Sequence, residues 1–393
     1  MAPPPTSRGF YAWAQNFFLS PGLVYAVGIA LLATPPIQRL IFYEHQFRWP
    51  LFANFDLPEA YGLALGTTLN LHLETPDNVT LGAWFVLSDP YYQSQQVCCH
   101  SSGQLTNSFS GSRSHAVQSN PTVPFLHGTG GPRASVARTQ FYSQITSRFR
   151  ANVLALDYRG FGDSTGAPAE KGVAIDAYTA WRWIAEQGAR DEYVLIIGHS
   201  LGTNIATRLG KQLATEGVKP RGITLLAPFS ELSALLETYH VLRMPILQPI
   251  TNFYMRRKLI KALTLERYDT LSNIEHLNVP VLFAHATDDN HVKHTHSKTL
   301  MGRLLDPYLP TLGHLPANPG FEAYRESLRR RTDARVLLVK QSQIANFGVL
   351  EEFETKHGKV VYVESMWGGH NLVPLQEGVQ DQIAKMFKLE GHS

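Results

Sequence analysis

The sequence predicts an α/β fold: a mostly parallel central sheet with helices on both faces, preceded by an apolar helix at the amino end. Two observations carry this prediction. From residue 121 onward, short apolar runs alternate with longer amphipathic ones, as in strands joined by right-handed helical crossovers. Before that point, residues 66–87 alternate apolar and polar side chains in two halves separated by a turn sequence. This pattern predicts a β-hairpin at one end of the sheet.

The composition is that of a globular protein with one large domain. The chain has 393 residues, of which 44% are hydrophobic and 17% charged, so it can bury a large core. We expect a membrane anchor and linker at 1–50 and the domain at 51–393. The net charge of +3 is too small to indicate a nucleic-acid partner, and we interpret the basic run at 329–331 as a solvated face.

Residues 17–33 are predicted to anchor the chain in a membrane. They are nearly all apolar, and as a helix they span roughly 25 Å, a little less than a hydrocarbon core of about 30 Å. A cleaved signal peptide and a helix packed on the domain are the alternatives. Arg39 and Arg48 favour a cytoplasmic domain, whereas the glycosylation sequon at Asn78 is meaningful only in a lumen.

The domain elements follow one another from the hairpin to the carboxyl end. Predicted strands lie at 123–126, 152–156, 193–197, 222–227, 279–285 and 359–363, and predicted helices at 136–149, 172–186, 203–213 and 376–387. Three segments interrupt this alternation. We expect an insertion of the disordered type near 89–120, a helical cap segment near 229–273 and a further insertion near 300–355.

The residues around Ser200 predict a sharp turn between a buried strand and a helix. Gly198-His199-Ser200-Leu201-Gly202 follows a branched apolar run and precedes a helical pattern. A tight, strained turn lifts a serine hydroxyl clear of a sheet edge, and side chains two residues before and after it would collide with the strand and helix. Glycine at 198 and 202 removes both collisions. An ordinary glycine-rich turn is the alternative interpretation of this pattern.

A serine needs two partners to become a nucleophile, and the sequence offers both. A base must take its proton, and a carboxylate must orient that base. Both are expected later in the chain, at the carboxyl ends of strands, where Asp289 and His370 stand. Asp288 is the alternative acid, and either aspartate alone could instead cap a helix. We prefer Asp289 because it stands three residues before Val292, where the chain enters the next helix.

Backbone N–H groups are expected to bind the oxyanion that forms in acyl transfer. One belongs to Leu201, directly after the nucleophile, at the positive amino end of a helix. The other is expected from Thr129, in the glycine-rich loop at 127–131 that follows the strand at 123–126. Glycines let this loop turn its N–H groups inward. We expect His127 and His199 to shape turns rather than to catalyse.

No metal or organic cofactor is predicted. The two cysteines, Cys98 and Cys99, are adjacent, which suits neither a disulfide nor a zinc site, so we place them in a surface loop. His291, His294 and His296 lie close together, but no matching set of acidic or cysteine ligands accompanies them. We interpret them as part of a polar loop that opens a helix.

Several motifs from about residue 35 to the carboxyl end carry a family resemblance. They are Pro36-Ile37-Gln38-Arg39, Phe125-Leu126-His127-Gly128, Asp157-Tyr158-Arg159-Gly160-Phe161-Gly162-Asp163-Ser164, Gly198-His199-Ser200-Leu201-Gly202-Thr203, Ala227-Pro228-Phe229 and His285-Ala286-Thr287-Asp288-Asp289. In this combination the chain resembles the membrane-anchored α/β-hydrolase domain lipases that act on monoacylglycerols and lysophosphatidylserine. The resemblance implies the α/β-hydrolase fold, with Ser200, Asp289 and His370 as nucleophile, acid and base. It also implies a catalytic domain in the lumen of the endoplasmic reticulum.

The sequence therefore predicts a serine hydrolase that cleaves lipid-like carboxylic esters through an acyl-enzyme on Ser200. The apolar stretch at 232–254 is either a lid over an acyl pocket or a packed helical pair. A thioesterase or a peptidase with the same triad is an alternative function. A catalytically silent hydrolase fold that serves as a membrane-tethered binding module is another, and it would hold Asp289, His370 and Ser200 out of hydrogen-bond reach. Head group, acyl-chain length and oligomeric state are left open.

Overall fold

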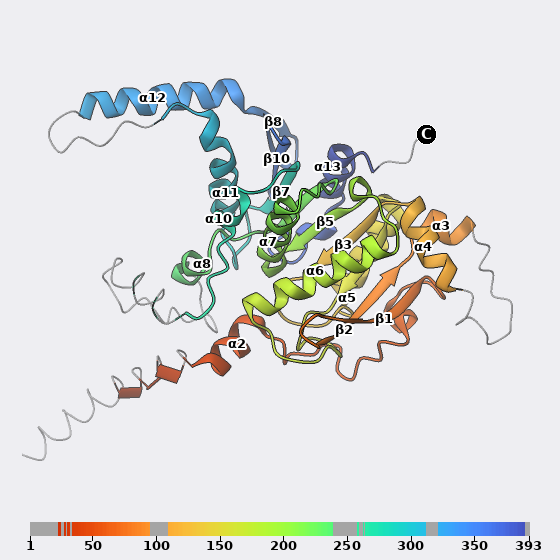
Figure 1. Cartoon of the computed structure of the whole chain (residues 1–393). Coiled ribbons are helices and arrows are strands. Elements are labelled where there is room, and N and C mark those ends of the chain that lie inside the picture. The colour runs from red at the N-terminus through yellow and green to blue at the C-terminus, as the bar shows by residue number, and fades with distance from the viewer. Residues whose placement is uncertain are drawn as a thin grey trace, which may run out of the picture.

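A ten-stranded sheet forms the centre of the protein (Figure 1). The structure is a computed structural model that describes residues 34–94, 109–238, 264–311 and 321–389, with isolated positions between 23 and 31 and at 258 and 262. The strand order is β1-β2-β4-β3-β5-β6-β7-β10-β9-β8. The strands are β1 Thr68–Glu74, β2 Thr80–Val86, β3 Thr122–Leu126, β4 Asn152–Leu156, β5 Leu195–His199, β6 Gly222–Leu226, β7 Val281–Ala286, β8 Lys340–Ile344, β9 Gly348–Thr355 and β10 Gly358–Ser365.

The middle of the sheet is parallel, as predicted. Strands β4, β3, β5, β6, β7 and β10 pair in parallel with one another, in that order. Every residue of β3, β4, β6 and β7 is buried, because helices cover both faces of the sheet and leave neither face open to solvent. The predicted hairpin is also confirmed: β1 and β2 pair antiparallel at one end of the sheet.

Two hydrophobic clusters lie on opposite faces of the sheet. Ile196 and Ile197 are neighbours on β5, yet each belongs to a different cluster, since successive side chains of a strand point to opposite faces. One cluster is completed by α6 Glu170–Glu186 and α7 Leu201–Thr215, through Trp181 and Leu209. The other is completed by α5 Val136–Arg148 and α13 Glu377–Phe387, through Phe141 and Ile383. All four helices were predicted to within two or three residues.

The ends of the segment near 89–120 are more regular than expected. Helices α3 Asp89–Ser94 and α4 Phe109–Ser119 occupy them. Ala116 and Val117 of α4 are fully buried, and the side chain of Asn152 donates a hydrogen bond to the carbonyl of Ala116. This short apolar pair fixes the helix on the core, although the surrounding sequence is polar. Residues 95–108, with Cys98 and Cys99, lie outside the described part of the chain.

The segment near 300–355 extends the sheet, which the sequence did not reveal. Helix α11 Thr295–Leu305 is followed by α12 Phe321–Leu338, which extends away from the sheet in Figure 1, and then by β8 and β9. Strand β9 pairs antiparallel with β10, and β8 with β9. Strand β8 reads Lys-Gln-Ser-Gln-Ile, so it has no apolar alternation by which an edge strand is recognised.

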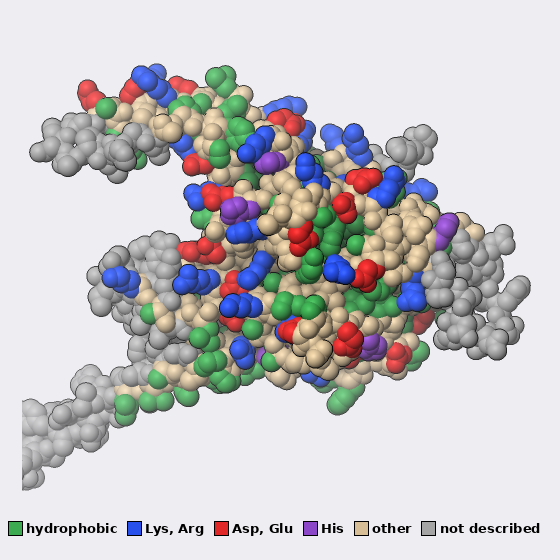
Figure 2. All heavy atoms as spheres, in the orientation of Figure 1, with side chains coloured by type: hydrophobic (Ala, Val, Ile, Leu, Met, Phe, Trp, Pro, Cys, Tyr) green, Lys and Arg blue, Asp and Glu red, His purple; other side chains and the backbone are tan. Residues whose placement is uncertain are grey.

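The amino-terminal segment reaches the domain through α2 Pro35–Tyr43. Tyr43 is fully buried, and its hydroxyl hydrogen-bonds the hydroxyl of Tyr268. Most of the predicted anchor at 17–33 lies outside the described residues. Its described apolar side chains are exposed, as Figure 2 shows at lower left: Leu23, Val24, Val27 and Leu31. In the residues that the structure describes, no helix has the length and apolar character needed to cross a membrane.

Candidate active site

Ser200 occupies a strained turn between β5 and α7. Its φ of 52° and ψ of −118° lie in a region that side chains with a Cβ rarely adopt. The turn is held by hydrogen bonds from the Ser200 N–H to the carbonyl of Leu226, at 2.9 Å, and from the Thr203 N–H to the carbonyl of Ser200, at 3.0 Å. Strain of this kind persists only where the surrounding structure fixes it, and here it presents the hydroxyl at the carboxyl edge of the sheet.

The two glycines of the turn are there because backbone comes too close for a side chain. A Cβ on Gly198 would lie 2.4 Å from the carbonyl oxygen of Gly202. A Cβ on Gly202 would lie 1.9 Å from the carbonyl oxygen of Leu126, at the end of β3. Both distances are far below van der Waals contact with rigid backbone. The collisions expected from the sequence are therefore real, and they involve the helix in one case and the neighbouring strand in the other.

The structure brings Ser200, His370 and Asp289 into one hydrogen-bonded chain. The Nε2 atom of His370 is 2.7 Å from the Ser200 hydroxyl oxygen, and its Nδ1 atom is 2.7 Å from Oδ2 of Asp289. A carboxylate only accepts, so Nδ1 carries the proton and Nε2 is left to accept from the hydroxyl. These distances are those of an intact serine, histidine and acid arrangement. They differ from the separated side chains that a silent binding module would have.

Asp289 is held as a charged acceptor. Its Oδ1 accepts the backbone N–H groups of His291 and Val292, at 2.8 and 2.9 Å. Burial alone would raise the pKa of Asp289, but hydrogen bonds from His285 and His370 outweigh burial and lower this pKa well below its ordinary value. The carboxylate therefore stays ionised wherever the protein is folded at ordinary pH.

Asp288, the alternative acid, has a different partner. Its Oδ1 accepts the backbone N–H of Gly369 at 2.8 Å. This contact fixes the loop just before His370 and does not involve the imidazole. The two neighbouring carboxylates thus have different contacts: Asp289 accepts from the His370 ring, and Asp288 accepts from the backbone just before His370.

The loop at 127–131 lies against the nucleophile. A Cβ on Gly128 would be 3.0 Å from the Cβ of Ser200. The N–H groups of Gly130 and Gly131 donate to the carbonyls of Tyr43 and Phe47, at 2.9 and 3.1 Å. Within the described residues, the N–H of Thr129 has no acceptor among the backbone and side-chain contacts. Thr129 therefore follows the residue that lies against Ser200 and has a free donor, as is expected of a residue in an oxyanion site.

Leu201 supplies the second expected donor. It is the first residue of α7, and the N–H groups in the first turn of a helix have no intrahelical acceptor. The positive end of the α7 dipole adds to the attraction for a negative oxygen at this point. Of the two predicted oxyanion donors, Leu201 thus follows Ser200 directly in the chain, and Thr129 follows Gly128, which lies against Ser200.

Comparison with known proteins agrees with this geometry. The profile of the family described as "Alpha/beta hydrolase family" matches residues 125–346, more than half of the chain. The chain belongs to this α/β hydrolase family. A crystal structure of an alpha-beta hydrolase from Vibrio vulnificus has the same fold, with a TM-score of 0.53 at 17% identity, covering 90% of this chain and 94% of that one.

This α/β hydrolase is similar in sequence to two curated relatives within the family. Protein ABHD12B of Homo sapiens is 30% identical over 271 residues, covering 67% of this chain and 69% of that protein. Lysophosphatidylserine lipase ABHD12 of Danio rerio is 27% identical over 271 residues, covering 68% of this chain and 66% of that protein. The chain thus spans just under two thirds of the length of the zebrafish lipase.

The hydrogen-bonded chain of this hydrolase continues beyond Asp289 to His285, a contact that the sequence did not reveal. The Nε2 atom of His285 is 3.1 Å from Oδ2 of Asp289 and 2.9 Å from the carbonyl of Val292. Its Nδ1 atom is 2.7 Å from the hydroxyl of Ser297. Since both Nε2 neighbours only accept, Nε2 carries the proton and the serine donates to Nδ1. The sequence feature that could have indicated a role for His285 is that it is the one polar residue of the strand β7.

Two further histidines flank the His370 ring. The ring centres of His199 and His291 lie 5.2 and 5.5 Å from that of His370. Burial lowers the pKa of His199 to about 3, so its ring is neutral at ordinary pH and donates from Nε2 to the carbonyl of His370 at 2.9 Å. His199 therefore supports the His370 backbone. In the part of the chain that the structure describes, no cluster of ligand side chains could hold a metal ion.

Proposed function

We propose that this protein hydrolyses carboxylic esters of lipids, of the monoacylglycerol or lysophospholipid class, through an acyl-enzyme on Ser200. The observation that carries the proposal is the hydrogen-bonded chain from the Ser200 hydroxyl through His370 to Asp289. This chain makes an alcohol into a nucleophile, and the two N–H groups beside it stabilise negative charge on the carbonyl oxygen that is attacked.

The reaction follows from the roles that these groups can play. Ser200 Oγ attacks the ester carbonyl carbon while Nε2 of His370 takes its proton, and the N–H groups of Leu201 and Thr129 bind the resulting oxyanion. His370 then gives the proton to the leaving alcohol as the ester C–O bond breaks. Water attacks the acyl-enzyme by the same route and releases the fatty acid. Asp289 remains unprotonated and stabilises the imidazolium that forms in each half-reaction.

Exposed apolar side chains beside the site support a lipid substrate. Phe47 and Trp49 are 67% and 68% exposed, in the loop whose carbonyl groups hold Gly131 and Ser135. Trp367 and Leu372 are 64% and 56% exposed, on either side of His370. Large apolar side chains exposed in this way favour contact with acyl chains or a lipid surface. The relative named lysophosphatidylserine lipase has the same kind of substrate.

The predicted lid stays a proposal. Residues 239–254 of the stretch at 232–254 lie outside the described residues. Its described beginning, α8 Leu232–Thr238, buries Leu232 and Leu235 against the domain core. We propose that the segment after α8 covers an acyl chain attached to Ser200, because α8 follows β6, whose last residue, Leu226, accepts a hydrogen bond from the Ser200 N–H.

We also propose that the amino-terminal segment anchors the protein in the membrane of the endoplasmic reticulum, with the domain in the lumen. The exposed apolar residues between 23 and 31 support an anchor. Asn78 is exposed in the turn between β1 and β2, where a glycan meets no steric obstacle from the sheet. Expressed in cells, the protein should lose about one glycan of mass on glycosidase treatment, and Asn78→Gln should show no shift. An unglycosylated wild-type protein would contradict a lumenal domain.

A substrate panel tests the ester preference. The purified full chain is assayed with a monoacylglycerol, lysophosphatidylserine, a long-chain acyl-coenzyme A thioester and an acyl peptide of matched chain length. We expect fatty acid to be released fastest from the two glycerolipids, and release to stop after treatment with a fluorophosphonate. Faster release of coenzyme A or of a peptide fragment would favour the alternative substrates. A wild-type protein that neither hydrolyses a substrate nor reacts with the fluorophosphonate would exclude an enzyme.

A further inference from the structure

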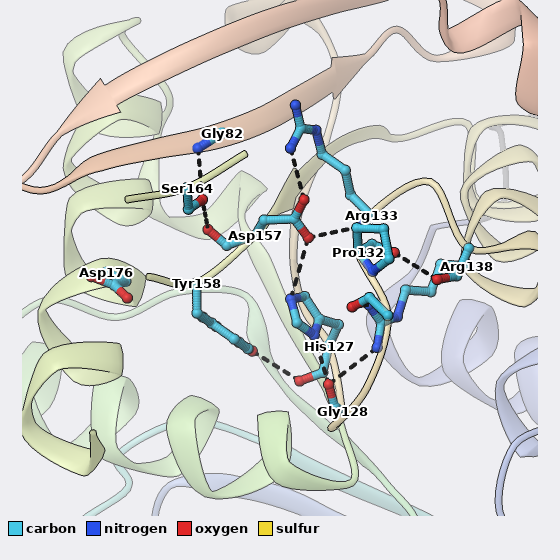
Figure 3. Close-up of polar contacts among 12 residues, drawn as sticks. Gly82, His127, Gly128, Pro132, Arg133, Arg138, Asp157, Tyr158, Ser164 and Asp176 are labelled. Carbon is cyan, nitrogen blue, oxygen red and sulfur yellow. Dashed lines mark hydrogen bonds and ion pairs between the residues drawn. The ribbon is translucent and has the colours of Figure 1, made fainter. Parts of the chain in front are cut away.

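Arg138 holds the loop that lies against the nucleophile, although no sequence motif singles it out. From the first turn of α5, its guanidinium reaches back to four consecutive carbonyl oxygens of this loop. Nη2 is 3.1 Å from the carbonyl of Gly128, 3.3 Å from that of Thr129 and 2.5 Å from that of Gly130, and Nη1 is 2.5 Å from that of Gly131. Figure 3 shows Arg138 pointing toward Gly128 from the side opposite Tyr158.

Within the described residues, all the hydrogen bonds of the Arg138 guanidinium go to these carbonyl groups. Among the described residues, no carboxylate forms an ion pair with Arg138. Arg133 provides a contrast, five residues earlier in the chain: its Nη1 lies 2.7 Å from a carboxylate oxygen of Asp157 and 2.6 Å from one of Asp163. A guanidinium neutralised by carboxylates has little field left for its surroundings. One that is held only by carbonyl oxygens keeps most of its field and polarises the peptide groups that it contacts.

One of these peptide groups is the proposed oxyanion donor. The carbonyl of Gly128 and the N–H of Thr129 belong to the same planar peptide unit. That carbonyl accepts two hydrogen bonds, from Nη2 of Arg138 at 3.1 Å and from Nδ1 of His127 at 2.7 Å. Hydrogen bonds to the oxygen of an amide draw electron density from its nitrogen, so the N–H at the other end becomes a stronger donor.

The remaining contacts leave the loop little freedom to turn. The hydroxyl of Tyr158 donates to the carbonyl of His127 at 3.0 Å. The N–H groups of Gly130 and Gly131 are already used by the carbonyls of Tyr43 and Phe47. Every carbonyl from 127 to 131 thus accepts a hydrogen bond, and the N–H of Thr129 is left for a ligand. This is preorganisation, in which the donor does not have to reorient when charge develops.

We propose that Arg138 is a positioning residue for the oxyanion site, which both orients the Gly128–Thr129 peptide and strengthens its N–H as a donor. The inference rests on the proposed ester hydrolysis. Since Arg138 acts on the developing oxyanion and not on the bound ester, its removal should affect turnover and leave substrate binding nearly unchanged.

The test compares Arg138→Met and Arg138→Lys with the wild type, using the full chain and an ester that the wild type hydrolyses. Active sites are titrated with a fluorophosphonate so that misfolded protein does not count. Arg138→Met should lower kcat about 30-fold, less than the 10²–10³-fold loss in kcat that is typical when a whole oxyanion donor is removed. The KM should change less than about threefold. Affinity for a trifluoromethyl ketone, whose serine adduct carries an oxyanion, should weaken by a similar factor. Arg138→Lys keeps the charge but reaches fewer carbonyls, so its kcat and its ketone affinity should lie between those of the wild type and those of Arg138→Met.

A matched control lies on the same helix. Arg148→Met removes ion pairs with Glu377 and Asp381 but touches no atom of the loop, so kcat and ketone affinity should stay at wild-type values. A fully active wild type together with unchanged kcat and ketone affinity in Arg138→Met would overturn this inference alone. A wild type without ester hydrolysis would overturn the proposed function and this inference with it. If the methionine variant does not fold, wild-type kcat in Arg138→Lys overturns the inference.

Discussion

Replacing Ser200 by alanine should abolish labelling by a fluorophosphonate probe and lower kcat for ester hydrolysis about 10⁶-fold. The hydroxyl is the only group in the hydrogen-bonded chain that can form the acyl-enzyme, and it stands 2.7 Å from its base. Without it, hydrolysis must proceed by direct attack of water, helped only by the oxyanion donors. In-gel fluorescence measures labelling, and released fatty acid measures turnover of titrated protein.

Two comparisons make the Ser200 experiment specific. Ser147→Ala, on the exposed face of α5, removes a hydroxyl that bonds only backbone carbonyls, and it should label and turn over like the wild type. The double variant Ser200→Ala/His370→Ala should be no slower than Ser200→Ala, because a base without a nucleophile has no proton to take. Labelling of Ser200→Ala at the wild-type rate would show that the nucleophile lies elsewhere.

Replacing Asp289 by asparagine should lower kcat about 10⁴-fold while the protein remains folded. The carboxylate accepts from both imidazole neighbours, His370 at 2.7 Å and His285 at 3.1 Å. An amide presents a donor to one of them, which favours the tautomer of His370 that carries its proton on Nε2. That tautomer cannot take a proton from Ser200. Steady-state kinetics on titrated enzyme measure the loss, and a thermal melt checks the fold.

Asp288→Asn is the matched control for the acid. It changes the neighbouring residue in the same way, but the oxygen that accepts the Gly369 N–H is retained in the amide. We expect a fall in kcat of no more than about fivefold, since the net hydrogen bond to the loop weakens by about 1 kcal/mol. A larger loss for Asp288→Asn than for Asp289→Asn would assign the acid to Asp288.

The hairpin, the parallel strands and the turn around Ser200 could be predicted from the sequence because their determinants are local. A buried parallel strand has to be mostly apolar, and β3 and β4 are apolar after their first residues, Thr122 and Asn152. The strained turn needs glycine two residues before and two residues after its serine. A Cβ at either position would clash with backbone atoms of α7 or β3. Such requirements appear in the chain itself, at fixed spacing.

Contacts between distant elements were decided only in three dimensions. Asp288 and Asp289 have the same chemistry and are adjacent in the chain, and only the position of His370 after β10 determines which carboxylate meets the ring. No sequence pattern singled out His285, because its role depends on Asp289 and Ser297 both lying within hydrogen-bond distance of its ring.

The sequence by itself thus determined the fold class, the strained turn that carries Ser200 and the order in which its hydrogen-bonded partners follow along the chain, through steric and hydrophobic rules that act over a few residues. Only the tertiary structure decided how polar groups share their hydrogen bonds: which carboxylate orients His370, and that Arg138 holds the carbonyl groups beside Ser200. Hydrogen bonds require direction and distance within a few tenths of an ångström. The packing of the whole domain sets those distances, and no spacing along the chain encodes them.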